Sequence, residues 1–357
     1  MKAYEIQSSA GIDAIALVDR PEPKPAAGQV LIKVKATSLN YRDLLVAEGA
    51  YGFGQKYPLI PLSDGAGEVV AVGEGVTRVK VGSRVAGIFF QDWIYGSLTK
   101  EKMKSDLGGG IDGMLAEYVV LHQDGLVILP DYLSYAEGAT LPCAAVTAWH
   151  GLVTKGNINA GESVLLLGTG GVSIFALQFA KIYGARAIVI SSSDEKLARA
   201  TQLGADETIN YKTTPDWEKQ VYQLTNRTGV DHVVEVGGAG TLPKSLQAVR
   251  IGGGISLIGI LSGRGSEIDP MPILFKSLTV QGIYVGSREM FEAMNQTMQQ
   301  HQIKPIIDRV FPFTEAREAY HYLKSATHFG KVVINLNTFA KIRANKNLGK
   351  NGKMTHT

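Results

Sequence analysis

Three glycines follow a short apolar run near the middle of the chain. The run is Ser163–Leu167, and Gly168, Gly170 and Gly171 come directly after it. A strand that ends in such a turn points free backbone N–H groups, and the positive end of the next helix, at one place. Because this arrangement suits a pyrophosphate, the segment predicts a dinucleotide site and, with it, hydride transfer.

The residues around this turn also predict the elements that hold it in place. Ser163–Leu167 is typical of a strand that a parallel sheet buries on both faces. Ser173 stands where the usual G-x-G-x-x-G pattern has its third glycine, and serine is small enough for close packing of helix on strand. The next apolar residues recur at helical spacing and stop before Gly184: Val172, Phe175, Phe179 and Ile182. Taken alone, the turn also fits any glycine-rich connection in an α/β sheet.

Strand and helix patterns alternate after the turn, which favours the dinucleotide interpretation. Helices are predicted over Asp194–Leu203 and Pro243–Arg250. Further strands are predicted over Ala187–Ser191, Glu207–Tyr211, His232–Val236, Gly254–Ile260 and Leu278–Tyr284. This order predicts an α/β fold with a doubly wound parallel sheet.

The N-terminal part of the chain has a different pattern. Four β-rich runs separated by turn residues predict a small barrel: Val30–Ala36, Gly67–Val72, Arg84–Phe89 and Ala116–Leu121. Helical patterns at Ser134–Gly138 and Leu141–Val153 lead into the parallel sheet. After it come a helix near Met290–Gln300 and a strand at Lys331–Leu336, which we expect to return to the N-terminal domain.

Composition limits the classes of function. With 357 residues, 45% of them hydrophobic, the chain is long enough for two domains with real cores. The net charge of +3 argues against a nucleic-acid surface. No run of 18 apolar residues predicts a membrane span, and the N-terminus lacks the apolar core of a signal peptide. A single cysteine fits a reducing compartment, so we expect a cytoplasmic protein.

Several motifs in this order resemble the medium-chain dehydrogenase/reductases, specifically the zinc-free members near the quinone oxidoreductases. The resemblance covers roughly residues 1–337 and rests on GQVLIKVKATSLNYRDLL (Gly28–Leu45), SDGAGEVVAVGEGV (Ser63–Val76), LPCAAVTAWHGL (Leu141–Leu152), SVLLLGTGGVS, KLARATQLGADETINY and HFGKVVI (His328–Ile334). It implies a GroES-like β-barrel catalytic domain from residues 1–133 and 285–337, and a Rossmann dinucleotide-binding domain from residues 134–284. The polar residues 338–357 are expected to form a loosely ordered extension.

The resemblance also allows a test for zinc. In the zinc-dependent members three side chains hold the catalytic metal, and the matching positions here are Asn40, Ser63 and Cys143. A catalytic zinc normally needs three firm His, Cys or carboxylate ligands, and Asp64 with Cys143 would supply only two. The region Phe90–Met114 replaces the four-cysteine lobe of many zinc members. We therefore expect no metal, with Cys143 as a small buried hydrophobe or, alternatively, a reactive thiol.

The end of the second strand bears on the choice of coenzyme. An NAD enzyme usually has Asp or Glu there, which repels a 2′-phosphate. This chain instead has Ser191, Ser192 and Ser193, followed by Lys196 and later Tyr211. Hydroxyls and an ammonium can hold a phosphate, and the resembling NADPH-dependent enzymes use a similar set. We favour NADP (NADPH) over NAD, although Ser192 or Ser193 can also cap the next helix and the adjacent acid, Asp194, can also take the ribose role.

The resemblance places other residues along the coenzyme. Arg288 and Lys331 come late in the chain, and for each of them a solvated surface charge is the alternative. The full set of other expected contacts is Thr147, Gly168, Gly170, Gly171, Val172, Gly237, Ile260 and Leu261.

Hydride transfer without zinc needs other groups to stabilise the charge that develops on a substrate oxygen. The resemblance puts the loop Asn40–Asp43 against the nicotinamide. Asn40 can donate an amide N–H, Tyr41 can donate a phenolic proton, and Ser63 with Asp64 can complete a polar wall. Within that loop Arg42 either holds an anion or points outward, and Asp43 is expected to accept backbone N–H groups. The alternative is a polar loop between barrel strands.

The expected substrate is a small carbonyl compound or a quinone. Enones and quinones spread the developing charge over a conjugated system, so they need less electrophilic help than a simple ketone. A zinc-independent alcohol or aldehyde dehydrogenase is one alternative, and a nucleotide-binding relative without catalysis is another. From the resemblance we also expect a homodimer that pairs through Leu278–Tyr284.

Overall fold

The structure is a computed structural model that describes residues 1–51, 56–263, 265 and 267–336. The chain divides into two compact units. Of the described residues, the barrel unit contains those in Met1–Cys143, Ser287–Asn295 and 307–336, and the parallel-sheet unit contains those in Ala144–Gly286 and Gln296–Ile306. The segment Gln296–Ile306 therefore belongs with the parallel sheet, whereas the sequence-based division placed it with the barrel. The predicted extension, 338–357, lies outside the described residues.

The parallel-sheet unit has six strands in the order β10-β9-β8-β11-β12-β13, and every neighbouring pair is parallel. Their bounds are β8 (Ser163–Leu167), β9 (Arg186–Ser191), β10 (Glu207–Asn210), β11 (Val230–Glu235), β12 (Val249–Leu257) and β13 (Thr279–Gly282). The strand order reverses beside β8, as in dinucleotide-binding sheets. The predicted doubly wound sheet is confirmed.

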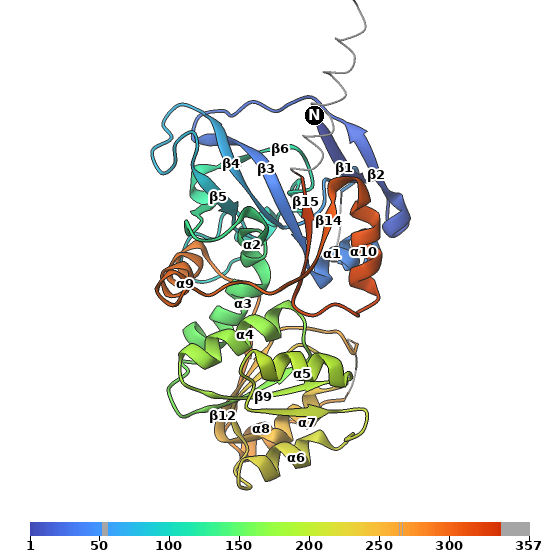
Figure 1. Ribbon diagram of the computed structural model, residues 1–357, viewed down its shortest axis with the longest axis vertical. Coiled ribbons are helices and arrows are strands. Elements are labelled where there is room, and N and C mark those ends of the chain that lie inside the picture. The colour runs from blue at the N-terminus through green and yellow to red at the C-terminus, as the bar shows by residue number, and fades with distance from the viewer. Residues whose placement is uncertain (52–55, 264, 266, 337–357) are drawn as a thin grey trace, which may run out of the picture. The chain divides into compact units, whose positions relative to one another are not determined.

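Helices cover both faces of this sheet. Figure 1 shows two helices above its strands and three below them: α4 (Gly171–Ile182) and α5 (Asp194–Gln202), then α6 (Trp217–Leu224), α7 (Leu242–Ala248) and α8 (Met271–Phe275). The interior of β8 is buried, as the continuous apolar run requires. Residues 141–155, predicted as one helix to Val153, form two wide π-helical segments on either side of α3 (Val146–Trp149).

The barrel unit is built on a seven-stranded sheet. Its order is β14-β15-β3-β4-β5-β7, and β6 also pairs with β3. The bounds are β3 (Gln29–Leu39), β4 (Asp64–Val72), β5 (Arg84–Gly87), β6 (Tyr118–His122), β7 (Leu126–Ile128), β14 (Ile307–Pro312) and β15 (Lys331–Asn335). A separate hairpin pairs β1 (Lys2–Ile6) with β2 (Ile15–Asp19). One apolar cluster, to which β1, β3, β4 and β15 contribute, forms the core.

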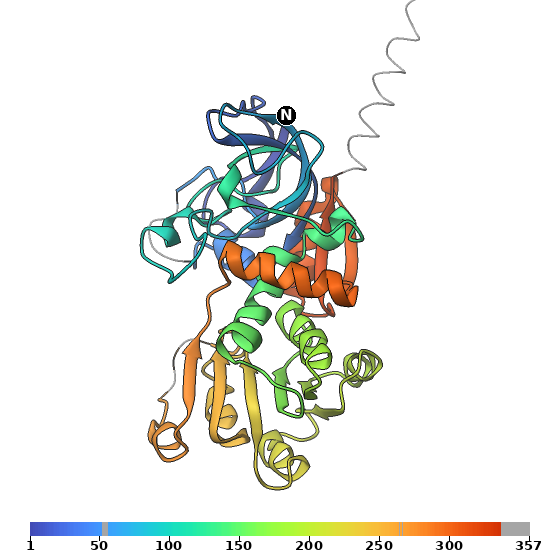
Figure 2. The same ribbon diagram turned by 90° about the vertical axis from the view of Figure 1, so that its left-hand side faces the viewer.

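The C-terminal strands return to the N-terminal strands, as predicted. β15 pairs antiparallel with β3, so Val332 lies opposite Leu39. Figures 1 and 2 show these red strands beside the blue ones, with helix α10 (Ala316–Lys324) packed on β14 and β15. The remaining helices of this unit are α1 (Tyr41–Ala47) and α2 (Tyr135–Gly138), while α9 (Arg288–His301) begins in it.

The segment Asn40–Asp43 is the start of helix α1, so its interpretation as a loop is wrong. Asn40 is the N-cap, and its backbone N–H donates to Asp43 Oδ2 at 2.7 Å. A capping box of this kind satisfies backbone donors that the first helical turn leaves free.

Within the described ranges, no helix is both long and apolar enough to cross a membrane.

Candidate functional site

Three strands of the barrel unit bring polar side chains to one place. β3 ends at Leu39, β4 begins at Asp64 and β15 begins at Lys331. The register places Ser38 opposite Asp64 and Leu39 opposite Val332. Asn40, Ser63, Asp64 and Lys331 therefore meet, and we call these four residues the polar cluster.

Lys331 is buried at the centre of the polar cluster and is only 3% exposed. Its ammonium donates to the Leu39 carbonyl at 2.6 Å and to Asn40 Oδ1 at 2.5 Å. It also lies 3.6 Å from Asp64 Oδ2. The alternative of a solvated surface charge is therefore wrong for Lys331.

The Asn40 carboxamide has a defined orientation. An ammonium can donate but not accept, so the atom facing Lys331 must be the carboxamide oxygen. The carboxamide nitrogen, Nδ2, then makes no hydrogen bond of good geometry among the described residues, although the Asn40 side chain also interacts with the Asp64 carboxylate and lowers its pKa, and Asn40 is only 9% exposed. A buried donor without a partner is costly, which is why such groups are rare away from strained or functional positions.

Asp64 is fully buried, and its carboxylate accepts from Ser63 Oγ at 3.0 Å. Burial raises the pKa of Asp64 to about 6, although the Lys331 ammonium acts in the opposite direction. Burial disfavours the charged form of a carboxyl group, and here this effect exceeds the attraction of the neighbouring cation. Asp64 therefore titrates close to neutral pH.

Arg42 and Asp43 have structural roles beside the cluster. Arg42 is buried and donates to the carbonyls of Leu107 and Gly108 and to Asp106 Oδ2, at 2.9, 3.1 and 2.6 Å. It therefore neither points outward nor keeps its charge free for a substrate anion. Asp43 accepts the Asn40 backbone N–H, as predicted. Tyr41, the first residue of α1, is 42% exposed.

The residues at the matching zinc positions do not fit a catalytic zinc. The only side-chain oxygen of Asn40 already accepts from an ammonium, whose charge would repel a second cation. Burial and the nearby Asp64 raise the pKa of the Cys143 thiol, which disfavours the thiolate that binds metal. Across the described ranges, no group of three or more His, Cys, Asp or Glu side chains is placed to hold a metal ion. The Cys143 residue as a whole is partly exposed, although its thiol is buried.

The glycine turn of the parallel-sheet unit has the geometry of an anion site. Gly168 has φ +74°, which glycine adopts without strain, and Gly170 is the N-cap of α4. A Cβ on either glycine would meet no described atom within 4 Å, so the space beside the turn is open. The first N–H groups of α4, including those of Gly171 and Val172, lack acceptors within the helix. Ser173 is buried and donates to the Leu167 carbonyl at 2.7 Å, which ties helix to strand at the third glycine position.

The ends of β9 and β10 bring the predicted phosphate-binding residues together. Ser191 is buried at the end of β9, and its carbonyl accepts from the Tyr211 backbone N–H at 3.0 Å. Ser192 follows, and Lys196 lies in the first turn of α5. These residues therefore lie on adjoining elements at the carboxyl edge of the sheet, where ligands of such folds bind.

Two neighbours of this group also have local roles. Ser193 is the N-cap of α5, and its hydroxyl accepts from the Lys196 backbone N–H at 3.3 Å, which confirms the capping interpretation for Ser193. Asp194 Oδ1 accepts from Asn210 Nδ2 at 2.7 Å. One oxygen of the Asp194 carboxylate is therefore already used.

Sequence analysis missed Glu235, the last residue of β11. Its carboxylate is fully buried and accepts from the N–H groups of Gly237 and Gly238 at 2.7 and 3.0 Å and from Thr241 Oγ1 at 2.6 Å. Leu261 N–H donates to the Val236 carbonyl, so the predicted contacts after β11 and β12, Gly237, Ile260 and Leu261, lie on adjoining loops. The sequence did contain a signal for Glu235, because a charged residue there directly follows the apolar strand residues Val233 and Val234.

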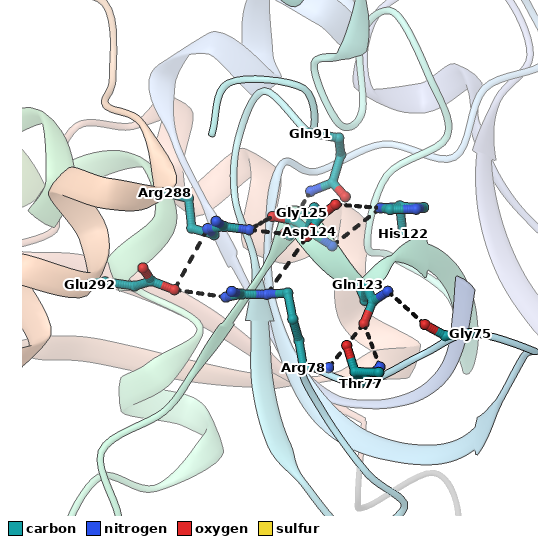
Figure 3. Close-up of polar contacts among 10 residues, drawn as sticks. All are labelled: Gly75, Thr77, Arg78, Gln91, His122, Gln123, Asp124, Gly125, Arg288 and Glu292. Carbon is teal, nitrogen blue, oxygen red and sulfur yellow. Dashed lines mark hydrogen bonds and ion pairs between the residues drawn. The ribbon is translucent and has the colours of Figure 1, made fainter. Parts of the chain in front are cut away.

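Two further expected coenzyme contacts, Arg288 and Thr147, belong to different units of the chain. Arg288 belongs to a network within the barrel unit, in which it donates to the Asp124 carbonyl at 2.9 Å and lies 3.6 Å from Glu292 (Figure 3). Figure 3 also shows Arg78 bridging the same two acids from the other side. Thr147 is buried in α3 of the parallel-sheet unit. The guanidinium charge of Arg288 is thus matched by carboxylates of its own unit.

Comparisons with known proteins agree with this architecture. The alcohol dehydrogenase GroES-like domain matches residues 26–131, and the zinc-binding dehydrogenase family matches residues 171–300. A zinc-type alcohol dehydrogenase-like protein of Schizosaccharomyces pombe is 46% identical over 315 residues, which are 87% of this chain and 91% of that protein. The quinone oxidoreductase of Sus scrofa is 29% identical over 321 residues, 87% of this chain and 90% of that protein.

Solved structures are similar over nearly the whole described chain. An NAD-dependent alcohol dehydrogenase has a TM-score of 0.87 at 33% identity, covering 94% of this chain and 100% of its own. A mycobacterial protein complexed with NADPH has a TM-score of 0.80 at 25% identity, with the same coverage. With a barrel unit, a doubly wound sheet and these relatives, the chain belongs to the medium-chain dehydrogenase/reductase superfamily of oxidoreductases.

Proposed function

We propose that this protein is an NADPH-dependent, zinc-independent oxidoreductase that reduces a quinone or an α,β-unsaturated carbonyl compound. The observation that carries the proposal is the polar cluster, in which the amide of Asn40 and the hydroxyl of Ser63 stand at two positions that match metal ligands of zinc-dependent relatives, and the Lys331 ammonium contacts that amide. The similarity to a quinone oxidoreductase supports the substrate class. The similarity to a protein complexed with NADPH supports the coenzyme class.

The parallel-sheet unit would hold the coenzyme, which supplies a hydride when bound. Backbone N–H groups at Gly168, Gly170, Gly171 and Val172 suit its pyrophosphate. The 2′-phosphate would lie among Ser191, Ser192, Ser193, Lys196 and Tyr211. Thr147, Gly237, Ile260 and Leu261 would line the nicotinamide end.

The polar cluster would act on the substrate oxygen. When an enone or a quinone accepts a hydride at carbon, negative charge develops on its oxygen and a proton must follow. Asn40 Nδ2 is a buried donor that this oxygen would satisfy, and a preorganised donor of this kind stabilises such charge. Tyr41 would supply the proton, while Ser63 and Asp64 complete the polar wall. Hydride and proton together give the reduced product, so atoms and charge balance.

A zinc-independent alcohol or aldehyde dehydrogenase is the second candidate. The structural similarity to an NAD-dependent alcohol dehydrogenase favours it. Oxidation of NADPH at 340 nm should be followed with a quinone, an enone and an aldehyde in parallel, and repeated with NADH. The proposal expects turnover of the quinone or the enone. Turnover of the aldehyde alone would favour the second candidate, and tight NADPH binding without turnover would indicate a nucleotide-binding protein.

The proton donor has its own test. If Tyr41 donates the proton, Tyr41→Phe should lower kcat by about ten- to a thousand-fold, because general acids contribute on that scale. The coenzyme Kd should not change. An unchanged kcat would remove Tyr41 from the mechanism.

We also propose that the protein is a cytoplasmic homodimer. Strand β13 lies at one end of the six-stranded sheet, where a second copy can pair with it. Helix α8 lies before it in the chain and buries none of its residues, although Leu274 and Phe275 are apolar and exposed. A second copy of this chain would cover these side chains by a two-fold symmetric contact.

A further inference from the structure

We infer that Lys331 is a positioning residue that stands in for a metal ion. Its fixed ammonium holds the oxygen of the Asn40 carboxamide and thereby presents Nδ2 to the substrate oxygen. This inference rests on the proposed function and assigns to Lys331 a role other than the coenzyme contact expected from sequence.

Strand pairing fixes the position of Lys331. Lys331 is the first residue of β15, and Val332 beside it is paired with Leu39 at the end of β3. Its side chain is buried and ends against the Leu39 carbonyl and the Asn40 carboxamide. The ammonium is thus held by the backbone of one strand and by the side chain that follows it.

The contacts recorded for the Lys331 ammonium all lie within the polar cluster. An ammonium has three N–H donors. Two are used by the Leu39 carbonyl and Asn40 Oδ1, while Asp64 Oδ2, at 3.6 Å, forms an ion pair with the ammonium without a hydrogen bond. The charge of Lys331 is therefore matched inside the polar cluster.

The hydrogen bond from Lys331 also fixes the orientation of the Asn40 carboxamide. Without a charged donor, either end of a carboxamide could face β15. With the ammonium in place only the oxygen can, so the nitrogen is left as a donor. A hydrogen bond from a charged donor also draws electron density from the carboxamide, which makes the N–H groups stronger donors. A metal would stabilise an oxyanion directly, whereas here the cation acts through Asn40.

Lys331→Met keeps the length of the side chain and removes the charge, so it tests the inference directly. We expect kcat to fall by about 100- to 1,000-fold, the usual effect of losing a preorganised donor to an oxyanion. The NADPH Kd, from fluorescence titration, should change by less than about three-fold, since charged hydrogen bonds to a phosphate would cost far more. A ten-fold weaker NADPH Kd with an unchanged kcat would assign Lys331 to the coenzyme instead.

Lys276→Met is the matched control. Lys276 likewise has its ammonium held by backbone carbonyls, those of Leu246, Gln247 and Val249, but it belongs to the parallel-sheet unit and contacts no residue of the polar cluster in these hydrogen bonds. Its loss should affect stability and leave kcat unchanged. If Lys331→Met does not fold, Lys331→Gln keeps a neutral donor at the same position and should show a smaller loss of kcat.

Asn40→Asp completes the design. It keeps an oxygen facing Lys331 and removes the N–H donors, so kcat should fall as in Lys331→Met. The double variant should lose little more than either single variant, because the two residues act as one unit. Fully additive losses would contradict the inference.

One measurement is independent of activity. The side-chain amide resonance of Asn40 in a ¹⁵N spectrum, identified by its absence in Asn40→Asp, should move in Lys331→Met and not in Lys276→Met. If no quinone, enone or aldehyde is reduced by the wild type, the proposed function fails, yet this resonance and the NADPH Kd still decide the placement of Lys331. An unmoved resonance would overturn it.

Discussion

At the scale of single residues, the proposed preference for NADPH rests on the side chains at the end of β9. Ser191 replaces the acid that would repel a 2′-phosphate, and Lys196 follows in the first turn of α5. Sequence alone could place these residues on a strand end and a helix start. That Tyr211 lies beside Ser191 followed only from the pairing of β10 with β9.

Lys196→Glu should weaken the binding of NADPH by about 10- to 100-fold, the value of a charge-assisted hydrogen bond. NADH binding should change little, because NADH lacks the 2′-phosphate. Fluorescence titration with both coenzymes measures the difference. Lys219→Glu, which makes the same charge change on the exposed face of α6, is the control. Equal losses for both coenzymes would remove Lys196 from the phosphate site.

Asp64 predicts a pH-dependent stability. Its pKa is about 6 in the folded protein and about 3.9 in an unfolded chain. Between these values the folded state binds more protons, so the free energy of unfolding falls as the pH rises. The stabilisation is complete below about pH 4, and about 3 kcal/mol of it is lost by pH 7, at 1.36 kcal/mol per pKa unit.

Asp64→Asn removes this titration. Urea unfolding at pH 4, 5, 6 and 7 should show the variant gaining about 2 kcal/mol relative to wild type across the range, because part of the titration lies below pH 4. The difference between the two proteins cancels the titration of other groups. If the free energy of unfolding depends on pH in the same way in both proteins, Asp64 does not cause the pH dependence.

At the scale of elements, the polar residues at the start of helix α1 stabilise the helix and hold it to a distant loop. Asn40 and Asp43 cap the helix, and Arg42 turns inward to the loop that carries Asp106. The guanidinium also lies over the rings of Tyr51 and Phe89, at 4.4 and 4.9 Å. The acceptor role of Asp43 was predicted from the sequence, but the start of a helix was not, and the inward direction of Arg42 depended on a loop more than sixty residues away.

Arg42→Met should destabilise the barrel unit strongly. It leaves the buried carboxylates of Asp43 and Asp106 without their cation, which costs about 3–5 kcal/mol when one partner of a buried pair is removed. Arg78→Met removes an exposed pair with Glu292 and should cost no more than about 1 kcal/mol. Urea denaturation compares the two variants, and similar losses would contradict a structural role for Arg42.

At the scale of the whole molecule, the exposed apolar residues of α8 bear on assembly. Phe275 is 72% exposed in the isolated chain, and Leu274 beside it is similarly open. Sequence patterns predicted a strand at β13, but could not show that α8 leaves its apolar side chains uncovered. Only the packing of the other helices decides which surface remains free.

Phe275→Glu should shift the protein from dimer to monomer, because it would bury a charge in the proposed contact. Sedimentation velocity at several protein concentrations measures the change. Val81→Glu adds the same charge at an exposed apolar position of the barrel unit and should leave the dimer intact. A monomeric wild type, or a dimer that tolerates Phe275→Glu, would refute this contact.

The sequence by itself determined the parallel sheet and its glycine turn. β8 and α4 were predicted almost to the residue, since apolar spacing and turn glycines act over a few neighbouring residues. The relatives and both family matches agree with that architecture. Short elements such as α1, α6 and β14 were missed because their patterns are too brief to stand out.

The polar cluster was decided by tertiary structure. Asn40, Ser63 and Asp64 were candidates from the start, but Lys331 was expected elsewhere, on the coenzyme or at the surface. Lys331 and Asn40 are 291 residues apart in the chain and meet because β15 pairs with the end of β3. Register across that distance depends on the packing of a whole core, which no local pattern records.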